Sequence, residues 1–174
     1  MVVKGVNSAV RILGIDPGLN VTGYGVIETS SPGGSSLLVV EAGVIRGGRG
    51  SLAQRIERIH QGLTDLVSGL APQVLALEEI YSHYQRPRTA ILMAHARGVI
   101  CLAAAQHGLE VVAYAATQVK RLLTGSGRAG KADVQRAVCR ELGLDSVPEP
   151  HDVADALAIA MCHAFLQRTV SLPQ

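Results

Sequence analysis

The architecture of this chain follows from residues 12–26, which read ILGIDPGLNVTGYGV. The apolar run from Val10 to Ile15 has the length of a buried strand, and Asp16-Pro-Gly stops it because proline cannot donate to a strand ladder. A second strand is predicted from Val21 to Glu28. Glycines within these strands often mark a place where a ligand or another backbone approaches closely. The stretch therefore predicts a strand pair with a carboxylate at the end of its first strand.

Strand signals continue after this pair, and helix signals then alternate with them. Segment 30–36 has turn composition and precedes a third predicted strand over 37–45, so the first three strands form an antiparallel meander. The later elements are predicted as a helix over 51–70 with Ser51 as N-cap, a strand over 74–77, a helix over 89–106, a strand over 110–114, and helices over 117–123, 131–142 and 152–167. This order predicts an α/β fold, a mixed five-stranded sheet covered by helices on both faces.

The composition describes one globular unit of 174 residues, with 48% hydrophobic residues and a formal net charge of +2. A chain of this length can bury a full core, so we expect one domain over 10–168, an N-terminal extension over 1–9 and a C-terminal tail over 169–174. The three cysteines have no CxxC spacing, which argues against disulfides and zinc and favours a cytoplasmic location. No secretory signal or membrane span is predicted, because the apolar runs are interrupted or short.

Carboxylates stand where two predicted strands end and where the last helix begins. Asp16 closes the first strand, and either Glu78 or Glu79 shares its face at the end of the strand over 74–77; parity alone does not say which. Asp152 and Asp155 are three residues apart and lie on one face of the last helix. Structural alternatives exist for all of them: a turn cap for the first, exit into solvent for the glutamates, and a capping box with Asp152 as N-cap for the helix acids.

Together these carboxylates form an all-oxygen donor set, which favours Mg²⁺ over zinc and allows Mn²⁺ to substitute. Two such ions about 4 Å apart activate a water and stabilise the leaving oxygen at a phosphodiester. The set therefore indicates a metal-dependent nuclease. His151 adjoins Asp152 and is a further candidate ligand, although a histidine beside a helix cap is more often a bystander.

Basic residues are concentrated in one part of the chain. Residues 82–136 carry eight Lys or Arg against two acids, a net of +6, whereas the remainder carries eight against twelve, a net of −4. Such segregation predicts a phosphate-binding surface beside an acidic site. The candidate DNA-binding residues are Tyr81, which could stack on a base, and Arg86, Arg88, Lys120, Arg121, Arg128 and Lys131. For Arg97 and Arg136, in the same segment, a solvated helix face is the alternative.

Five segments of the chain resemble the RuvC family of bacterial Holliday junction endonucleases. They are ILGIDPGLNVTGYGV over 12–26, LALE over 75–78, AHARG over 94–98, YAATQVK over 114–120 and ADALAI over 154–159. The resemblance implies a ribonuclease H-like fold and a homodimer that binds a four-way DNA junction and nicks two symmetrically placed strands. It also implies a role in recombination and repair, with a branch-migration helicase complex of the RuvAB type as partner.

The resemblance further implies roles for individual residues. Four carboxylates would hold two Mg²⁺ ions per subunit and carry catalysis: Asp16, Glu78, Asp152 and Asp155. This selects Glu78 over Glu79. Tyr81 matches an aromatic position that contacts junction bases, and Lys120 and Lys131 match basic positions near the scissile phosphate.

Two other functions compete with a junction nuclease. An actin-like sugar kinase or ATPase also begins with a strand ending in Asp and a glycine-rich hairpin, but it needs two such domains. A noncatalytic junction-binding module would not need four carboxylates. The helix over 89–106 is apolar on every side around 99–105, so we expect it to form the dimer contact, with deep burial inside one subunit as the alternative.

Overall fold

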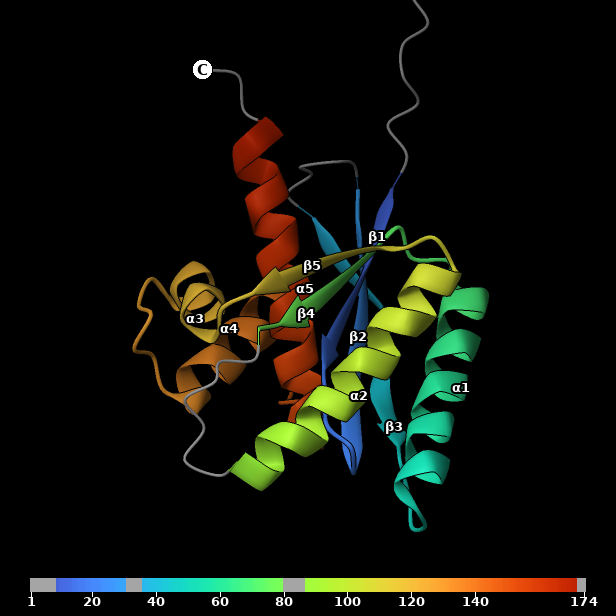
Figure 1. Ribbon diagram of the computed structural model, residues 1–174. Coiled ribbons are helices and arrows are strands. Elements are labelled where there is room, and N and C mark those ends of the chain that lie inside the picture. Colours follow the sequence, from blue (N-terminus) through green and yellow to red (C-terminus); the bar gives the residue numbers. More distant parts are fainter. Residues whose placement is uncertain (1–8, 31–35, 80–86, 172–174) are drawn as a thin grey trace, which may run out of the picture.

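Five strands form one mixed sheet in the computed structural model, which describes residues 9–30, 36–79 and 87–171 (Figure 1). The strands are β1 (Val10–Asp16), β2 (Val21–Thr29), β3 (Leu37–Arg46), β4 (Val74–Glu78) and β5 (Glu110–Tyr114), in the sheet order β3-β2-β1-β4-β5. The first three are antiparallel neighbours, whereas β4 is parallel to β1 and β5 is parallel to β4. The predicted meander and mixed sheet are confirmed; most of the predicted turn over 30–36 lies outside the described residues.

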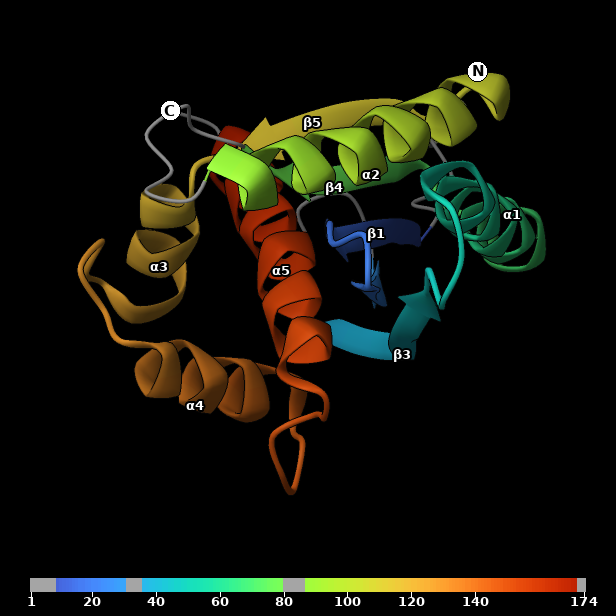
Figure 2. The same ribbon diagram turned by 60° about the horizontal axis from the view of Figure 1, so that its bottom comes forward.

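Helices cover both faces of this sheet, as predicted (Figure 2). One face carries α1 (Leu52–Leu70) and α2 (Pro87–Gln106), and the other carries α3 (Ala116–Thr124), α4 (Lys131–Leu142) and α5 (His151–Ser171). Ser51 caps α1 as predicted, since its hydroxyl accepts the Gln54 N–H. The capping-box alternative for the last helix is wrong: α5 begins at His151, so Asp152 lies inside its first turn and is not the N-cap.

Strand alternation divides the core into two layers, one on each face of the sheet. Ile12 and Ile27 pack in the layer under α3, α4 and α5, whereas Leu13 and Ile15 pack in the layer under α1 and α2. On β4 the same alternation sends Ala76 to the α5 side and its neighbours to the α1–α2 side. The residues that end β1 and β4 inherit this alternation, which decides the face they occupy.

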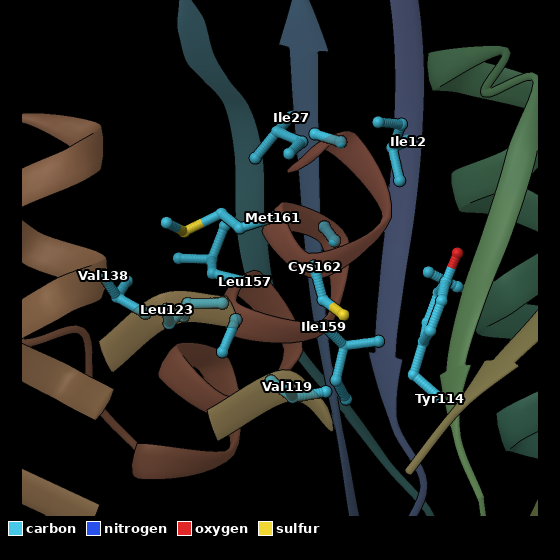
Figure 3. Close-up of a cluster of buried hydrophobic side chains, with 14 of the residues drawn as sticks. Ile12, Ile27, Tyr114, Val119, Leu123, Val138, Leu157, Ile159, Met161 and Cys162 are labelled. Carbon is cyan, nitrogen blue, oxygen red and sulfur yellow. The ribbon is translucent and has the colours of Figure 1, made fainter. Parts of the chain in front are cut away.

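α5 is the central helix of the α3–α4–α5 layer. Figure 3 shows Leu157, Ile159 and Met161 of α5 among side chains of the sheet and of α3 and α4. All residues of α5 over 153–164 are buried except Asp155, which is partly exposed. A helix that is apolar on most sides is stable only between two layers, and α5 lies between the sheet on one side and α3 and α4 on the other.

Three glycines allow α5 to lie directly on β1 and β2. A Cβ on Gly14 would meet the backbone of α5, 2.7 Å from the Ala160 nitrogen, and a Cβ on Gly25 would lie 2.6 Å from Leu157 Cδ2. A Cβ on Gly23 would lie 2.9 Å from Cβ of Asp152. The glycines therefore mark the close approach of another backbone, one of the two alternatives that the sequence leaves open.

α2 differs from α5 because one of its sides is exposed. Ala96, Ile100, Ala103 and Ala104 face the core, whereas Ile91 and Leu102 point outward with exposed fractions of 57% and 53%. Within the described residues, α2 is the one helix whose length and apolar composition would suffice to cross a membrane, a test that core helices of globular proteins also pass. The alternative that this helix is deeply buried within one subunit therefore does not hold for its outer side, where Ile91 and Leu102 are exposed.

Candidate active site

Asp16 and Glu78 are brought together by two parallel strands. Ile15 of β1 pairs with Leu77 of β4, so the residue that follows each of them stands at the same level of the sheet. Both carboxylates continue the alternation that faces α5, set by Gly14 and Ala76. Register and alternation therefore assign the α5 face to Glu78 and not to Glu79, whose N–H donates to the Tyr114 carbonyl at 2.9 Å.

The helix acids reach this point because the N-terminal end of α5 lies on the glycines of β2. Gly23 is the cross-strand partner of Asp16, and the space above Gly23 is filled by the backbone and Cβ of Asp152. Asp155 follows one helical turn later on the side of Glu78 and lines the same pocket as that glutamate. The four predicted carboxylates therefore surround one end of the sheet, and all four are partly buried.

The pKa values of Asp16 and Glu78 reflect the closeness of these acidic groups. The pKa of Asp16 is raised to about 7, first because burial penalises its charged form and then because Asp155, Glu78 and Asp152 repel that charge, against the opposing effect of Lys131. The pKa of Glu78 is raised by burial and by Asp155, with Lys120 acting in the opposite direction. Four acids that two lysines offset only in part form a cluster suited to hold a cation.

Two lysines lie on the open side of the cluster. A pocket of about 250 Å³ is lined by Glu78, Asp155, Lys120 and Lys131, with apolar walls from α3, α4 and α5. The Lys131 ammonium forms an ion pair with Asp155 at 3.0 Å, with half of the lysine side chain exposed. The pocket thus places cationic groups within reach of any phosphate that approaches the carboxylates.

The donor chemistry of the cluster fits a hard divalent cation. Its candidate ligands are carboxylate oxygens, which Mg²⁺ and Mn²⁺ prefer, and three further acids, Asp155, Glu78 and Asp152, add to the effect of burial in raising the pKa of Asp16. In the described parts of the chain, no three His, Cys, Asp or Glu side chains stand close enough around one point to hold a metal ion. Side chains would have to converge on an ion, and Asp155 would have to exchange its contact with Lys131.

The other predicted site residues do not all line the pocket. Lys120 and Lys131 line the pocket beside the carboxylates, whereas Arg128 lines an adjoining groove. His151 is exposed at the start of α5. Three positions lie apart from the pocket lining: Arg88 is exposed in the first turn of α2, Arg121 is exposed on α3, and Asp152 lies over β2. Tyr81 and Arg86 lie outside the described residues.

Two tertiary contacts, one to β4 and one to β5, are missed by sequence reasoning. The guanidinium of Arg97, on α2, donates from Nη1 to the backbone carbonyl of Glu78, so this arginine holds the end of β4 instead of forming a solvated face. On the opposite side, the Tyr114 hydroxyl bonds to Nδ1 of His163 at 2.6 Å, which ties β5 to α5. No sequence signal marks either contact, because the partners are 19 and 49 residues apart.

Comparisons with known proteins agree with this geometry. A family model described as crossover junction endodeoxyribonuclease RuvC matches residues 12–163. The chain is 54% identical to the crossover junction endodeoxyribonuclease RuvC of Rhodopirellula baltica over 160 residues, covering 91% of this chain and 88% of that one. It is 45% identical to the RuvC of Pelotomaculum thermopropionicum over 154 residues, covering 88% and 92%.

A solved structure, Thermus thermophilus RuvC in complex with a Holliday junction substrate, superposes with a TM-score of 0.85 at 33% identity, covering 93% of this chain and 97% of that one. This likeness confirms the ribonuclease H-like fold that the sequence resemblance implies. The yeast mitochondrial Holliday junction resolvase Ydc2, at 12% identity and a TM-score of 0.65, shares the fold alone. By sequence and by structure, the chain belongs to the RuvC family of crossover junction endodeoxyribonucleases.

Proposed function

We propose that this chain resolves four-way Holliday junctions in recombination and repair by hydrolysing two symmetrically placed phosphodiesters. The observation that carries the proposal is the carboxylate cluster of β1, β4 and α5 next to a pocket with two lysines, in a chain of a nuclease family. The related Thermus thermophilus protein has been solved with a Holliday junction substrate. Family membership disfavours the kinase or ATPase alternative, and the retained acids disfavour a noncatalytic module.

The catalytic residues of this proposal are Asp16, Glu78, Asp152 and Asp155, which would hold two Mg²⁺ ions, with Mn²⁺ able to substitute and His151 as an additional candidate ligand. When bound, the ions would activate the attacking water and stabilise the leaving oxygen. Lys120 and Lys131 bind the scissile phosphate at the pocket, where their charge offsets that of the substrate. The apolar pocket wall, with Val119 and Ile159, limits the water that competes for these groups.

DNA binding extends beyond this pocket in the proposal. Tyr81 stacks on an unpaired base, and basic side chains bind backbone phosphates: Arg86, Arg88, Arg121 and Arg128. The partners are a second copy of the chain and a branch-migration complex of the RuvAB type, in the cytoplasm. We assign the nuclease domain to 10–168, with an extension over 1–9 and a tail over 169–174; α5 itself continues to Ser171.

Asp155→Asn tests the proposal at its centre. The substitution removes a charge that both repels Asp16 and would hold the cation, so Mg²⁺-dependent cleavage of a four-way junction is expected to fall by on the order of 10³-fold or more. Junction binding, measured by gel shift in EDTA, is expected to persist. Asp145→Asn, which changes an exposed acid in the loop before α5, is the matched control.

The substrate comparison uses the wild-type chain. Paired symmetric nicks in the four-way junction, with little cutting of linear duplex of the same sequence, are expected. Equal cutting of both substrates would make the chain a general nuclease, and full cleavage by the Asp155→Asn variant would remove the carboxylate cluster from the reaction.

A further inference from the structure

A second concave surface adjoins the catalytic pocket and is more polar than it. This groove, about 560 Å³ in volume, runs between the end of α3, the loop over 125–130 and the outer side of α4. Three arginines line it, Arg128, Arg136 and Arg140, against one acid, Asp133. We call it the α4 groove. Its excess of positive charge suits an anionic ligand.

The arginines on α4 are held loosely. Asp133, Arg136 and Arg140 follow one another at helical spacing along one side of the helix. Arg136 pairs with Asp133, and Arg140 Nη2 pairs with Glu141 at 3.1 Å, but the two arginine side chains are 70% and 67% exposed. Exposed pairs of this kind contribute little to stability, so both guanidinium groups can be redirected to a phosphate at small cost.

The groove does not act as a simple helix N-terminus. Oδ2 of Asp133 accepts the N–H of Gly130, the N-cap residue, at 3.0 Å, so the chain's own carboxylate already lies at the start of α4. An anion in the groove would therefore be bound by guanidinium groups. Arginine is well suited to this role, because its planar fork donates two parallel hydrogen bonds to phosphate oxygens.

The α4 groove and the active-site pocket come close at the start of α4. Gly130 lines the groove, and the next residue, Lys131, lines the catalytic pocket. Arg136 and Arg140 lie five and nine residues beyond Lys131, which at about 100° per residue is close to half a turn round the helix, so they face the groove and not the pocket. A duplex bound at the pocket would reach them by passing over the start of α4, at Gly130 and Lys131.

We propose that the α4 groove binds backbone phosphates of the duplex arm that flanks the cleaved strand, with Arg136 and Arg140 as the contacting residues. This inference rests on the proposed nuclease function and extends its DNA-binding surface along α4. The arginines of the groove and its closeness to the pocket at Gly130 and Lys131 favour DNA over an acidic partner protein, because the duplex beside a cleaved strand carries further phosphates past the start of α4. The contacts are to phosphates, so they add affinity without base preference.

The test compares the double variant Arg136→Gln/Arg140→Gln with the charge-preserving variant Arg136→Lys/Arg140→Lys. Affinity for a four-way junction and for linear duplex is measured in EDTA between about 50 and about 200 mM salt, a range over which phosphate contacts weaken steeply. The glutamine variant is expected to bind about tenfold more weakly and to lower the slope of log K against log salt by about 1.8, which is about 0.9 for each lost phosphate contact. The lysine variant is expected to keep most of both.

Asp133→Asn is expected to change junction affinity in the opposite direction. The asparagine keeps a side-chain oxygen for the Gly130 N–H but removes the negative charge that competes with phosphate for the arginines, so the junction should bind more tightly. Unchanged affinity and salt slope in the glutamine variant would overturn the inference, and an acidic protein would then be the remaining candidate ligand of the groove. Thermal unfolding checks that each variant is folded. Wild-type chain that binds the junction through the groove but never nicks it would instead contradict the proposed function, so the two failures are distinguishable.

Discussion

The two faces of the sheet are built from similar apolar residues, but helices pack on them in different ways. On the α5 face, glycines on β1 and β2 allow a helix backbone to touch the sheet, and every candidate catalytic carboxylate lies at one end of that contact. On the α1–α2 face, the helices pack through Ile59, Leu63 and Ile100 side chains, and α2 keeps an exposed apolar side. Close backbone approach positions chemical groups on one face, whereas on the other face the exposed apolar side of α2 is where we expect a second subunit to pack.

This contrast explains why the acids tolerate one another. The rigid contact of α5 with β1 and β2 fixes Asp152 over Gly23, next to the strand position of Asp16, although the charges repel. Core burial on both faces supplies the free energy that holds them there. Substitutions that alter the closeness of α5 are therefore expected to change the site and the stability together.

Gly14→Ala should have the largest effect. The new methyl group would meet the Ala160 backbone nitrogen at 2.7 Å, and backbone cannot rotate away, so α5 must move off the sheet. We expect a loss of about 3 kcal/mol or more in the free energy of unfolding, and loss of junction cleavage as Asp152 and Asp155 shift. Urea denaturation measures the first effect and a nicking assay the second.

The matched control is Gly69→Ala on the other face, in the last turns of α1. Nothing lies within 4 Å of the added methyl, and alanine favours the helix, so the same chemical change is expected to stabilise the protein by about 0.5–1 kcal/mol. Equal effects of the two substitutions would contradict the conclusion that Gly14 permits the close approach of α5 to the sheet.

The order of strands and helices could be predicted from sequence because it depends on local patterns. The alternation of apolar residues in strands, their spacing in helices and the Ser51 cap all depend on residues that are near one another in sequence, and the element types predicted from them are confirmed. Boundaries shifted where local rules compete: α5 begins at His151, because Pro150 provides the carbonyl that accepts the Val153 N–H. The acid that looks like an N-cap is therefore inside the helix.

The sequence predicts which acids gather at one end of the sheet, but it does not predict their contacts. The choice between Glu78 and Glu79 depends on the pairing of β4 with β1, a relation between strands that neither strand contains alone. The hydrogen bond of Arg97 to the Glu78 carbonyl joins α2 to β4, and the ion pair of Lys131 with Asp155 joins α4 to α5. Such contacts follow from tertiary packing, which sequence periodicity does not encode.

Asp16→Asn should have the next largest effect, and of opposite sign. With its pKa raised to about 7 from 3.8, Asp16 binds its proton more tightly in the folded protein, so in the absence of metal the stability falls as pH rises from about 4 to 7 and stays lower above that. Asparagine carries no charge to desolvate. We expect the variant to be more stable than wild type by about 1–3 kcal/mol at pH 8 in EDTA, although it loses cleavage.

Urea unfolding at pH 8 and pH 4 measures this difference, which should shrink towards zero at the lower pH, where Asp16 is protonated. Adding Mg²⁺ at pH 8 should stabilise wild type more than the variant, because only wild type offers the full donor set. A variant that is less stable than wild type at pH 8 would show that Asp16 is held by favourable contacts and not by packing alone.

The smallest effect on stability is expected from Ile91→Glu/Leu102→Glu on the outer side of α2. Both side chains are more than half exposed, so the unfolding free energy of the isolated subunit should change by no more than about 0.5 kcal/mol. If this side forms the proposed dimer contact, the two buried charges should convert a dimer into monomers in sedimentation at micromolar concentration, and paired nicks should become single ones. Leu52→Glu, on the partly exposed start of α1, is the control and should leave the dimer intact. A wild-type chain that sediments as a monomer would contradict the prediction that a second subunit packs on the apolar outer side of α2.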